Sequence, residues 1–355
     1  MIKYIGSKRL LVPRIVAAIR ALRGGDRVAD LFSGTSRVAK ALKLAGFRVH
    51  ANDYASYAHV LATAYVQADG RRWAKEAADL IGELRTLPGA PGWFTETYCT
   101  RSRYIQPHNG ARIDAIRERI AGLRLPFELE SILLAALVEA ADRVDSTTGL
   151  QMAYLKQWAA RSHGPLDLRL PDLAPGAGKA TMGDAVALAP GIEADVAYLD
   201  PPYNQHSYLG NYHVWESLVR WDKPDVYGVA CKRVDVRERR SAFNSRRRFR
   251  AEFERLVRAL PVPCLVVSFS DEGFLGRADV EEILAARGRV EVLEIDYGRY
   301  VGARIGIYNP SGEKVGKVSH LRNREYLFFV APDAAAARAA RDAAASLGGQ
   351  MELPS

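Results

Sequence analysis

The sequence Asp200-Pro201-Pro202-Tyr203 directly follows residues 194–199, an apolar run that is typical of a buried strand. Open α/β sheets bind ligands at the edge where their parallel strands end. Because prolines lack backbone donors and keep the backbone extended, the Asp200 carboxylate and the Pro201 carbonyl can both point outward as acceptors. Tyr203 adds a flat surface for stacking. Two acceptors beside such a surface suit a planar substrate with an exocyclic amino group, such as adenine, whereas a rigid turn after a strand is the purely structural alternative.

Basic residues are concentrated shortly after this turn. The 355-residue chain has a formal charge of +9 and an isoelectric point near 9.4. Residues 231–250, called the basic segment below, contain nine Lys or Arg and two acidic residues, so they account for most of the excess. A basic protein favours an anionic partner, with nucleic acid first. A solvated helix face would have the same composition, but the short distance to the Asp-Pro-Pro-Tyr turn favours contacts with phosphates.

A second polar stretch, residues 30–36, ends the predicted strand at residues 27–32 and leads into a segment with helical spacing. It contains a single glycine, Gly34. Dinucleotide sites need several glycines and ATP-binding phosphate loops need Gly-Lys-Ser/Thr, so NAD, FAD and ATP are disfavoured. The acid Asp30 at the entrance of this loop favours a positively charged cofactor without phosphates. S-adenosylmethionine (SAM), which carries an ammonium and a sulfonium group, has these properties.

Two more acids follow predicted strands. Asp53 comes after residues 47–51 and is placed to hold the ribose hydroxyls of a cofactor. Asp184 comes after residues 180–182 and is a candidate acceptor for the adenine amino group of the cofactor. Either acid could instead cap a turn or a helix, and for Asp184 the two interpretations have equal weight.

The order of these segments predicts a Rossmann-like α/β fold with a mostly parallel sheet of about seven strands. Residues 1–66 and 180–332 would form a discontinuous SAM-binding catalytic domain, residues 67–179 a mostly helical insertion, and residues 333–355 an Ala-rich C-terminal tail. The predicted strands are residues 27–32, 47–51, 180–182, 194–199, 263–268, 290–297 and 324–330.

Cysteine usage and hydropathy indicate the compartment. Cys99, Cys231 and Cys264 are widely spaced, form no metal-binding pattern and favour a reducing environment. The apolar runs are too short to span a bilayer, and residues 1–6 do not have the character of a signal peptide. We therefore expect a cytoplasmic protein, associated with the nucleoid through DNA, that is monomeric and has no membrane partner and no metal.

Read in order, these segments resemble the Dam-like adenine-N6 DNA methyltransferases, in which the cofactor motif precedes the catalytic motif. Residues 4–8, Tyr-Ile-Gly-Ser-Lys, resemble the N-terminal motif of that group, whose lysine approaches the methionine carboxylate of SAM. The first motif differs, because Ser33 stands where many members have a second glycine. The resemblance covers residues 1–330, and its other segments are residues 30–34, 52–54, 94–99, 109–114, 153–158, 183–184, 200–203 and 241–246.

The resemblance implies transfer of a methyl group from SAM to the N6 atom of a flipped-out adenine in duplex DNA, with S-adenosylhomocysteine as product. The insertion is expected to recognise the target sequence, because it is large and the sheet domain is committed to cofactor and chemistry, and a cognate restriction endonuclease is an expected partner. The implied residues are Asp200, Pro201, Pro202 and Tyr203 for catalysis; Tyr4, Gly6, Lys8, Asp30, Phe32, Ser33, Gly34, Asp53, Tyr54 and Asp184 for the cofactor; and Arg233, Ser245, Arg246, Arg247 and Arg248 for DNA.

Other readings of the same turn stay open. Asp-Pro-Pro-Tyr also suits the amino groups of RNA bases, of cytosine N4 or of a protein glutamine. A catalytically silent DNA-recognition subunit is the alternative from another functional class. The complete catalytic turn and cofactor loop argue against such a subunit, and the basic segment argues for DNA.

Overall fold

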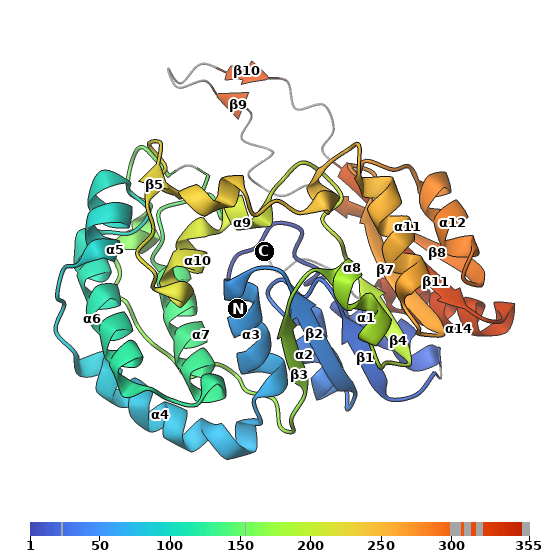
Figure 1. The fold of residues 1–355 in the computed structure, drawn as a ribbon, viewed down its shortest axis with the longest axis horizontal. Helices are drawn as coiled ribbons and strands as arrows, with labels where there is room; N and C mark the ends of the chain where they lie inside the picture. Colours follow the sequence, from blue (N-terminus) through green and yellow to red (C-terminus); the bar gives the residue numbers. More distant parts are fainter. Residues whose placement is uncertain (23, 153, 299–306, 309–313, 317–321, 350–355) are drawn as a thin grey trace.

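The computed structural model describes residues 1–22, 24–152, 154–298, 307–308, 314–316 and 322–349. A seven-stranded sheet with the order β3-β2-β1-β4-β7-β11-β8 lies at its centre (Figure 1). Its strands are β1 (Arg27–Asp30), β2 (Arg48–Asp53), β3 (Lys179–Met182), β4 (Val196–Leu199), β7 (Cys264–Ser270), β8 (Arg289–Gly298) and β11 (Arg322–Ala331). Neighbours are parallel except where β11 pairs with β7 and β8. The predicted fold class is confirmed.

Helices cover both faces of the sheet. Every residue of β4 and β7 is buried, as expected for central strands with helices above and below them. Because side chains alternate along a strand, Val28 faces the core under α1 and α2, whereas Ala29 faces the core under α11 and α12. The helices of the two faces are α1 (Val12–Ala21), α2 (Arg37–Leu44) and α14 (Ala334–Ala345) on one side, and α8 (Ala185–Leu188), α11 (Phe249–Ala259) and α12 (Arg277–Ala285) on the other.

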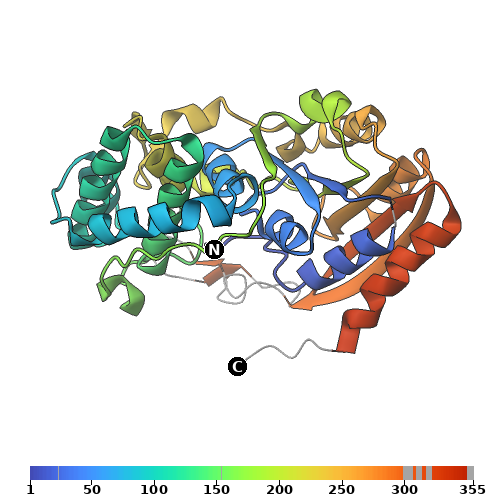
Figure 2. The same cartoon turned by 90° about the horizontal axis from the view of Figure 1, so that it is seen from below.

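The predicted C-terminal tail contains α14, which packs against α1 and β8. Figure 2 shows α1 and α14 side by side. Alanines at helical spacing, Ala337, Ala340 and Ala344, are fully buried in this contact, so the Ala-rich composition of α14 serves close packing. Residues 350–355 of the predicted tail lie outside the described residues.

A block of helices lies beside the sheet (Figure 1). It comprises α3 (Ser56–Ala62) with a π-helical turn (Thr63–Gln67), α4 (Gly70–Thr86), α5 (Trp93–Thr95) with a second π-helical turn (Glu96–Arg101), α6 (Pro107–Leu123) and α7 (Phe127–Arg143). α10 (His213–Arg220) follows the Asp-Pro-Pro-Tyr turn in sequence but joins this block. The Arg117 guanidinium of α6 donates to the carbonyls of Leu218 and Val219, at 3.0 and 3.1 Å. The exact division into domains stays a prediction.

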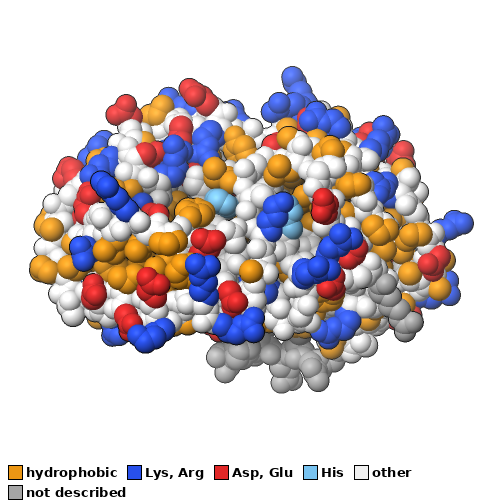
Figure 3. All heavy atoms as spheres, turned by 60° about the horizontal axis from the view of Figure 1, so that its bottom comes forward, with side chains coloured by type: hydrophobic (Ala, Val, Ile, Leu, Met, Phe, Trp, Pro, Cys, Tyr) orange, Lys and Arg blue, Asp and Glu red, His pale blue; other side chains and the backbone are white. Residues whose placement is uncertain are grey.

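Short elements connect these layers. They are α9 (Tyr208–Asn211), the hairpin of β5 (Val226–Tyr227) and β6 (Lys232–Arg233), the pair β9 (Ile307–Tyr308) and β10 (Lys314–Gly316), and single 3₁₀ turns at Ala160–His163, Ala189–Gly191, Val234–Arg237, Ala242–Asn244 and Ser346–Gly349. Figure 3 shows one face of the molecule, on which side chains of both charges are interspersed and hydrophobic side chains gather toward the helical block. Within the described residues, no helix combines the length and the apolar character needed to cross a membrane.

Candidate active site

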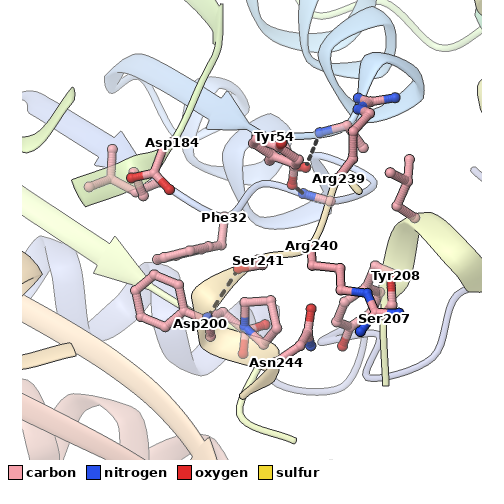
Figure 4. Close-up of a pocket in the computed structure, with 18 of the residues that line it drawn as sticks. Phe32, Tyr54, Asp184, Asp200, Ser207, Tyr208, Arg239, Arg240, Ser241 and Asn244 are labelled. Carbon is pink, nitrogen blue, oxygen red and sulfur yellow. Dashed lines mark hydrogen bonds between the residues drawn. The ribbon is translucent and has the colours of Figure 1, made fainter. Parts of the chain in front are cut away.

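One cavity lies at the edge where β1, β2, β3 and β4 end (Figure 4). The residues directly after each of these strands contribute to its wall, which is the edge at which open α/β sheets bind ligands. Predicted site residues in the lining are Tyr4, Gly6, Phe32, Gly34, Asp53, Tyr54, Asp184, Asp200 and Pro202. Lys8, Asp30, Ser33, Pro201 and Tyr203 do not line it.

The loop between β1 and α2 is fixed by the end of the neighbouring strand. Gly34 adopts φ +51°, and a Cβ there would lie 3.1 Å from the Tyr4 ring, so glycine is needed at this point. Its backbone amide donates to Asp53 Oδ2 at 2.8 Å, while Asp53 Oδ1 accepts from the Ala55 amide at 3.0 Å. Asp53 therefore caps a turn and lines the cavity at once. Burial raises the pKa of its carboxyl above the usual range.

Asp30 ends β1 and is 1 % exposed. Its Oδ1 atom has no hydrogen-bond partner among the described residues. Burial, together with the nearby carboxylates of Asp200 and Asp53, raises the pKa of Asp30 well above its usual range. The buried hydroxyl oxygens of Ser33 and Ser36 also lack partners in the described part of the chain. Such orphaned oxygens are costly, and they suit a ligand that brings a cation or hydrogen-bond donors.

Asp184 caps a helix and also lines the cavity. Its Oδ1 atom accepts from the amides of Val186 and Ala187, at 2.9 and 3.0 Å, so Asp184 is the N-cap of α8. Both of these bonds use the same oxygen, and the side chain lines the cavity. Capping thus fixes the orientation of a carboxylate in the cavity wall, and Figure 4 shows it on the same side of the cavity as Phe32.

Aromatic side chains form much of the remaining wall. Tyr4 stacks on Tyr208 and Tyr212, with ring centroids 5.2 and 4.6 Å apart, and its hydroxyl lies 3.0 Å from that of Tyr57. Gly6 has φ +70° and approaches the Tyr208 hydroxyl so closely that a Cβ would lie 3.0 Å from it. Tyr54 remains exposed beside the cavity, with the Arg239 guanidinium 5.6 Å from its ring centroid.

The Asp-Pro-Pro-Tyr turn is held by contacts on several sides. Lys8 Nζ lies 3.2 Å from Asp200 Oδ1 and 5.7 Å from the Tyr203 ring centroid. The Tyr203 ring packs on Phe269 with 5.2 Å between centroids, and its carbonyl accepts from the Phe274 amide at 2.8 Å. Burial raises the pKa of Asp200 to about 6, although Lys8 counteracts this effect. Pro201 is buried and Pro202 half-buried at the cavity.

Two stretches of the cavity wall, at residues 207–209 and 239–244, lie outside the predicted site residues. Asn244 Nδ2 donates to the carbonyls of Asn204 and His206, at 2.9 and 3.0 Å, and so ties the second stretch to the loop after the Asp-Pro-Pro-Tyr turn. Arg239 pairs with the fully buried Glu216 at 2.8 Å. Arg239 and Arg240 belong to the basic run and residues 241–246 to the family resemblance, but their pairing depends on partners that are distant in the chain.

The basic segment divides into paired and unpaired arginines. Arg246, Arg247 and Arg248 are exposed and form no ion pair with the described residues, and Ser245 beside them is half-buried. Arg233, in contrast, is 1 % exposed and is bound by Asp222 at 2.7 Å and by Asp235 at 3.0 Å. The predicted DNA contact of Arg233 is therefore wrong, because a buried guanidinium held by two carboxylates cannot reach a phosphate.

The fold and the cavity together define an α/β methyltransferase-like protein, in which an Asp-Pro-Pro-Tyr turn and a single-glycine loop meet at the carboxyl edge of a mostly parallel sheet. The family model of the D12 class N6 adenine-specific DNA methyltransferases matches residues 4–255. The chain belongs to this family. The predicted family, enzyme class and adenine specificity are thereby confirmed, and membership implies a methyl-donor cofactor and action on DNA.

Curated relatives agree with this assignment. The chain is 29% identical over 338 residues to the type II methyltransferase M.NlaIII of Neisseria lactamica, which covers 91% of this chain and 99% of that protein. It is 29% identical to the type II methyltransferase M.FokI of Planomicrobium okeanokoites and 28% identical to the modification methylase StsI of Streptococcus sanguinis. The matches span 53% of M.FokI and 48% of StsI, so the chain corresponds to about half of each of these longer proteins.

Proposed function

We propose that this chain transfers a methyl group from SAM to the N6 amino group of an adenine within a specific sequence of duplex DNA. The observation that carries the proposal is the shared cavity. Gly34, Asp53 and Asp184, expected to face the cofactor, line the same cavity as Asp200 and Pro202. Two reactants bound in one cavity are held close together, which removes much of the entropic barrier to transfer.

The residues around this cavity fit SAM. The unpaired buried oxygen of Asp30 suits a cationic group, and Asp53 at the end of β2 suits the ribose hydroxyls. Asp184 and the ring of Phe32 suit the adenine of the cofactor. When bound, SAM supplies an activated methyl group, and S-adenosylhomocysteine is left after transfer.

The catalytic turn acts on the amino group that receives the methyl. The lone pair of adenine N6 is delocalised into the ring and is a weak nucleophile. When the Asp200 carboxylate and the Pro201 carbonyl accept its two hydrogens, the nitrogen is drawn toward tetrahedral geometry and its lone pair becomes available. This role is positioning and electrostatic stabilisation, and Asp200 need not be a strong base. Tyr203 would stack on the base and hold its plane.

DNA binding involves two other regions. The exposed arginines Arg246, Arg247 and Arg248, with Ser245, would contact backbone phosphates while the target base leaves the stack, at a cost of roughly a few kcal/mol. Residues 67–179 would read the target sequence, because the sheet is already occupied by cofactor and chemistry. We further propose that the chain serves in a restriction-modification system with a cognate endonuclease, as the names of its relatives suggest, and that it acts as a monomer.

A transfer assay tests this function. The purified chain is incubated with methyl-labelled SAM and with duplex DNA, single-stranded RNA or protein, and the products are digested and analysed by mass spectrometry. We expect N6-methyldeoxyadenosine from duplex DNA alone. N4-methyldeoxycytidine as the product would instead make cytosine the target base. Labelled RNA or protein would make that molecule the substrate in place of DNA. SAM binding without any transfer would favour the catalytically silent recognition subunit.

A further inference from the structure

A buried ion cluster joins the catalytic turn to the last long strand of the sheet. The Lys8 ammonium lies between two carboxylates: it is 3.2 Å from Asp200 Oδ1 and it also forms an ion pair with Glu325 Oε1. Lys8 is 7 % exposed and Glu325 8 % exposed. A carboxylate in such an environment requires a cation, and Lys8 is the cation that the structure provides for both acids.

The sheet topology explains why Glu325 reaches this place. The parallel strands end at the cavity edge, where Asp200 directly follows β4. β11 runs in the opposite direction, so its beginning lies at that edge. Glu325 is in register with Ser270, the last residue of β7, and the Arg324 carbonyl accepts from the Asp271 amide at 3.0 Å. The position of Glu325 is thus fixed by the hydrogen-bonded pairing of β11 with β7 and not by a loop.

Among the residues that the structure describes, the other groups that act on Asp200 carry no compensating positive charge. Tyr198, Tyr203 and Tyr208 face this cluster as neutral hydroxyls whose pKa values are raised by burial, and Asp30 is a further acid. Burial raises the pKa of Asp200 most, and the positive charge of Lys8 lowers it. The negative charge of Glu325 raises this pKa again. The state of the catalytic carboxylate therefore depends on how Lys8 is divided between its two partners.

We propose that Glu325 is a positioning residue for the methyl transfer: it holds the Lys8 ammonium away from full pairing with Asp200. An ionised carboxylate has about four acceptor sites. If Lys8 paired with Asp200 alone, the ammonium would orient the carboxylate toward itself and weaken it as an acceptor for the target amino group. With Glu325 as a second partner, Lys8 orients Asp200 without saturating it. The inference rests on the proposed function, since it assigns Asp200 the target amine.

The variant Glu325→Gln keeps the size of the side chain and removes its charge. We expect kcat to fall by ~10- to 100-fold, as for a small displacement of a reacting group, while SAM affinity measured by calorimetry changes little. Because the repulsion between Glu325 and Asp200 is lost, the pKa of Asp200 should fall. The acid limb of the pH profile of kcat should therefore move to lower pH. The matched control is Glu291→Gln on β8, where Glu291 pairs with Arg341 at 2.7 Å and does not line the cavity.

A Glu325→Gln enzyme with the wild-type kcat and the wild-type acid limb would overturn this role. A loss of kcat with an unmoved acid limb would also overturn it, because a merely structural residue would produce that result. If Glu325→Gln does not fold, Glu325→Asp keeps the charge and withdraws it by one methylene; its acid limb should move in the same direction by less, and an unmoved limb rejects the proposal. Failure of the wild-type enzyme to methylate duplex DNA would instead reject the proposed function.

Discussion

The charged residues around the cavity form two groups that differ in how their charge is satisfied. Lys8, Asp200 and Glu325 are buried or half-buried and share their charges at short distance, and Arg233 is likewise enclosed by Asp222 and Asp235. Arg246, Arg247 and Arg248 are exposed and unpaired within the described residues. The first group holds the machinery in place, whereas the second is available to an external anion.

This difference has energetic consequences. Removing one partner of a buried, paired charge leaves the other partner uncompensated, which is costly. Exposed charges are screened by solvent and salt, and removing them changes the fold little. We therefore expect large effects on catalysis or stability from the buried group. From the exposed group we expect a salt-dependent effect on DNA affinity.

Asp200→Ala should produce the largest effect. It removes the acceptor for the target amine, and the loss of a key electrostatic group typically lowers kcat by ~10²–10³. SAM binding, measured by calorimetry, should be retained because the loop at Gly34 is held by Asp53 and not by Asp200. Asp200→Asn, which keeps the shape, serves as control for folding. A variant that retains more than about a tenth of the wild-type kcat would contradict the assigned role.

Arg233→Ala should destabilise the fold without altering how DNA binding responds to salt. It leaves Asp222 and Asp235 without their buried partner, so we expect a loss of about 2–3 kcal/mol in the free energy of unfolding, measured by urea denaturation. The matched control is Arg220→Ala. Arg220 pairs with the same two acids but its side chain is 34% exposed, so its removal should lower the free energy of unfolding by ~0–1 kcal/mol. Equal losses in both variants would remove the distinction between buried and exposed pairs.

The pH dependence of turnover tests the buried group directly. Burial raises the pKa of Asp200 to about 6, and the ionised carboxylate is a much stronger acceptor for the amine hydrogens than the protonated acid. Activity should thus be present above this pKa and should be lost as pH falls through about 6, by about tenfold per unit further down. The measurement is single-turnover methylation at saturating SAM and DNA between acid and neutral pH. A profile that stays flat to pH values well below the Asp200 pKa would show that Asp200 is not the titrating group.

The sequence predicted the sheet, the edge and nine of the residues that line the cavity. Local patterns were sufficient for this, because the acid or glycine after each predicted strand lies at the strand end in the structure, as Asp53 and Asp184 do. The family resemblance added Tyr4 and Gly6, which no local pattern would have linked to the same cavity.

The pairing of charges could not be predicted in this way. Lys8 and Glu325 are 317 residues apart in the chain, and their contact depends on the reversed direction of β11. Arg233 was grouped with Arg246–Arg248 because a charge run shows composition alone. One partner, Asp235, lies in the basic segment itself, but the other, Asp222, lies outside it, and composition alone does not show that the two acids enclose this arginine.

Replacing Arg246, Arg247 and Arg248 together by Ala tests how much the exposed group of charges contributes to DNA affinity. If all three neutralise phosphates, the slope of log K against log[salt] should flatten by up to ~2.7, at about 0.9 per contact, and all duplexes should be affected about equally. Stability and kcat at saturating DNA should change little, since none of the three forms an ion pair with the described residues. The control is Arg250→Ala in the same segment, whose guanidinium is held by Glu254, Asp279 and Glu282, so its loss should leave the salt slope unchanged.

Base-edge contacts by the three arginines would have a different signature. A bidentate contact of arginine with guanine discriminates against the wrong base by ~1–3 kcal/mol, so its removal relaxes sequence preference and does not weaken all duplexes equally. Arg246, Arg247 and Arg248 are consecutive and exposed, and we do not expect three consecutive side chains to face the floor of one groove together. An unchanged salt slope together with relaxed sequence preference would therefore place residues 246–248 on the recognition surface and would leave residues 67–179 without sole responsibility for the target sequence.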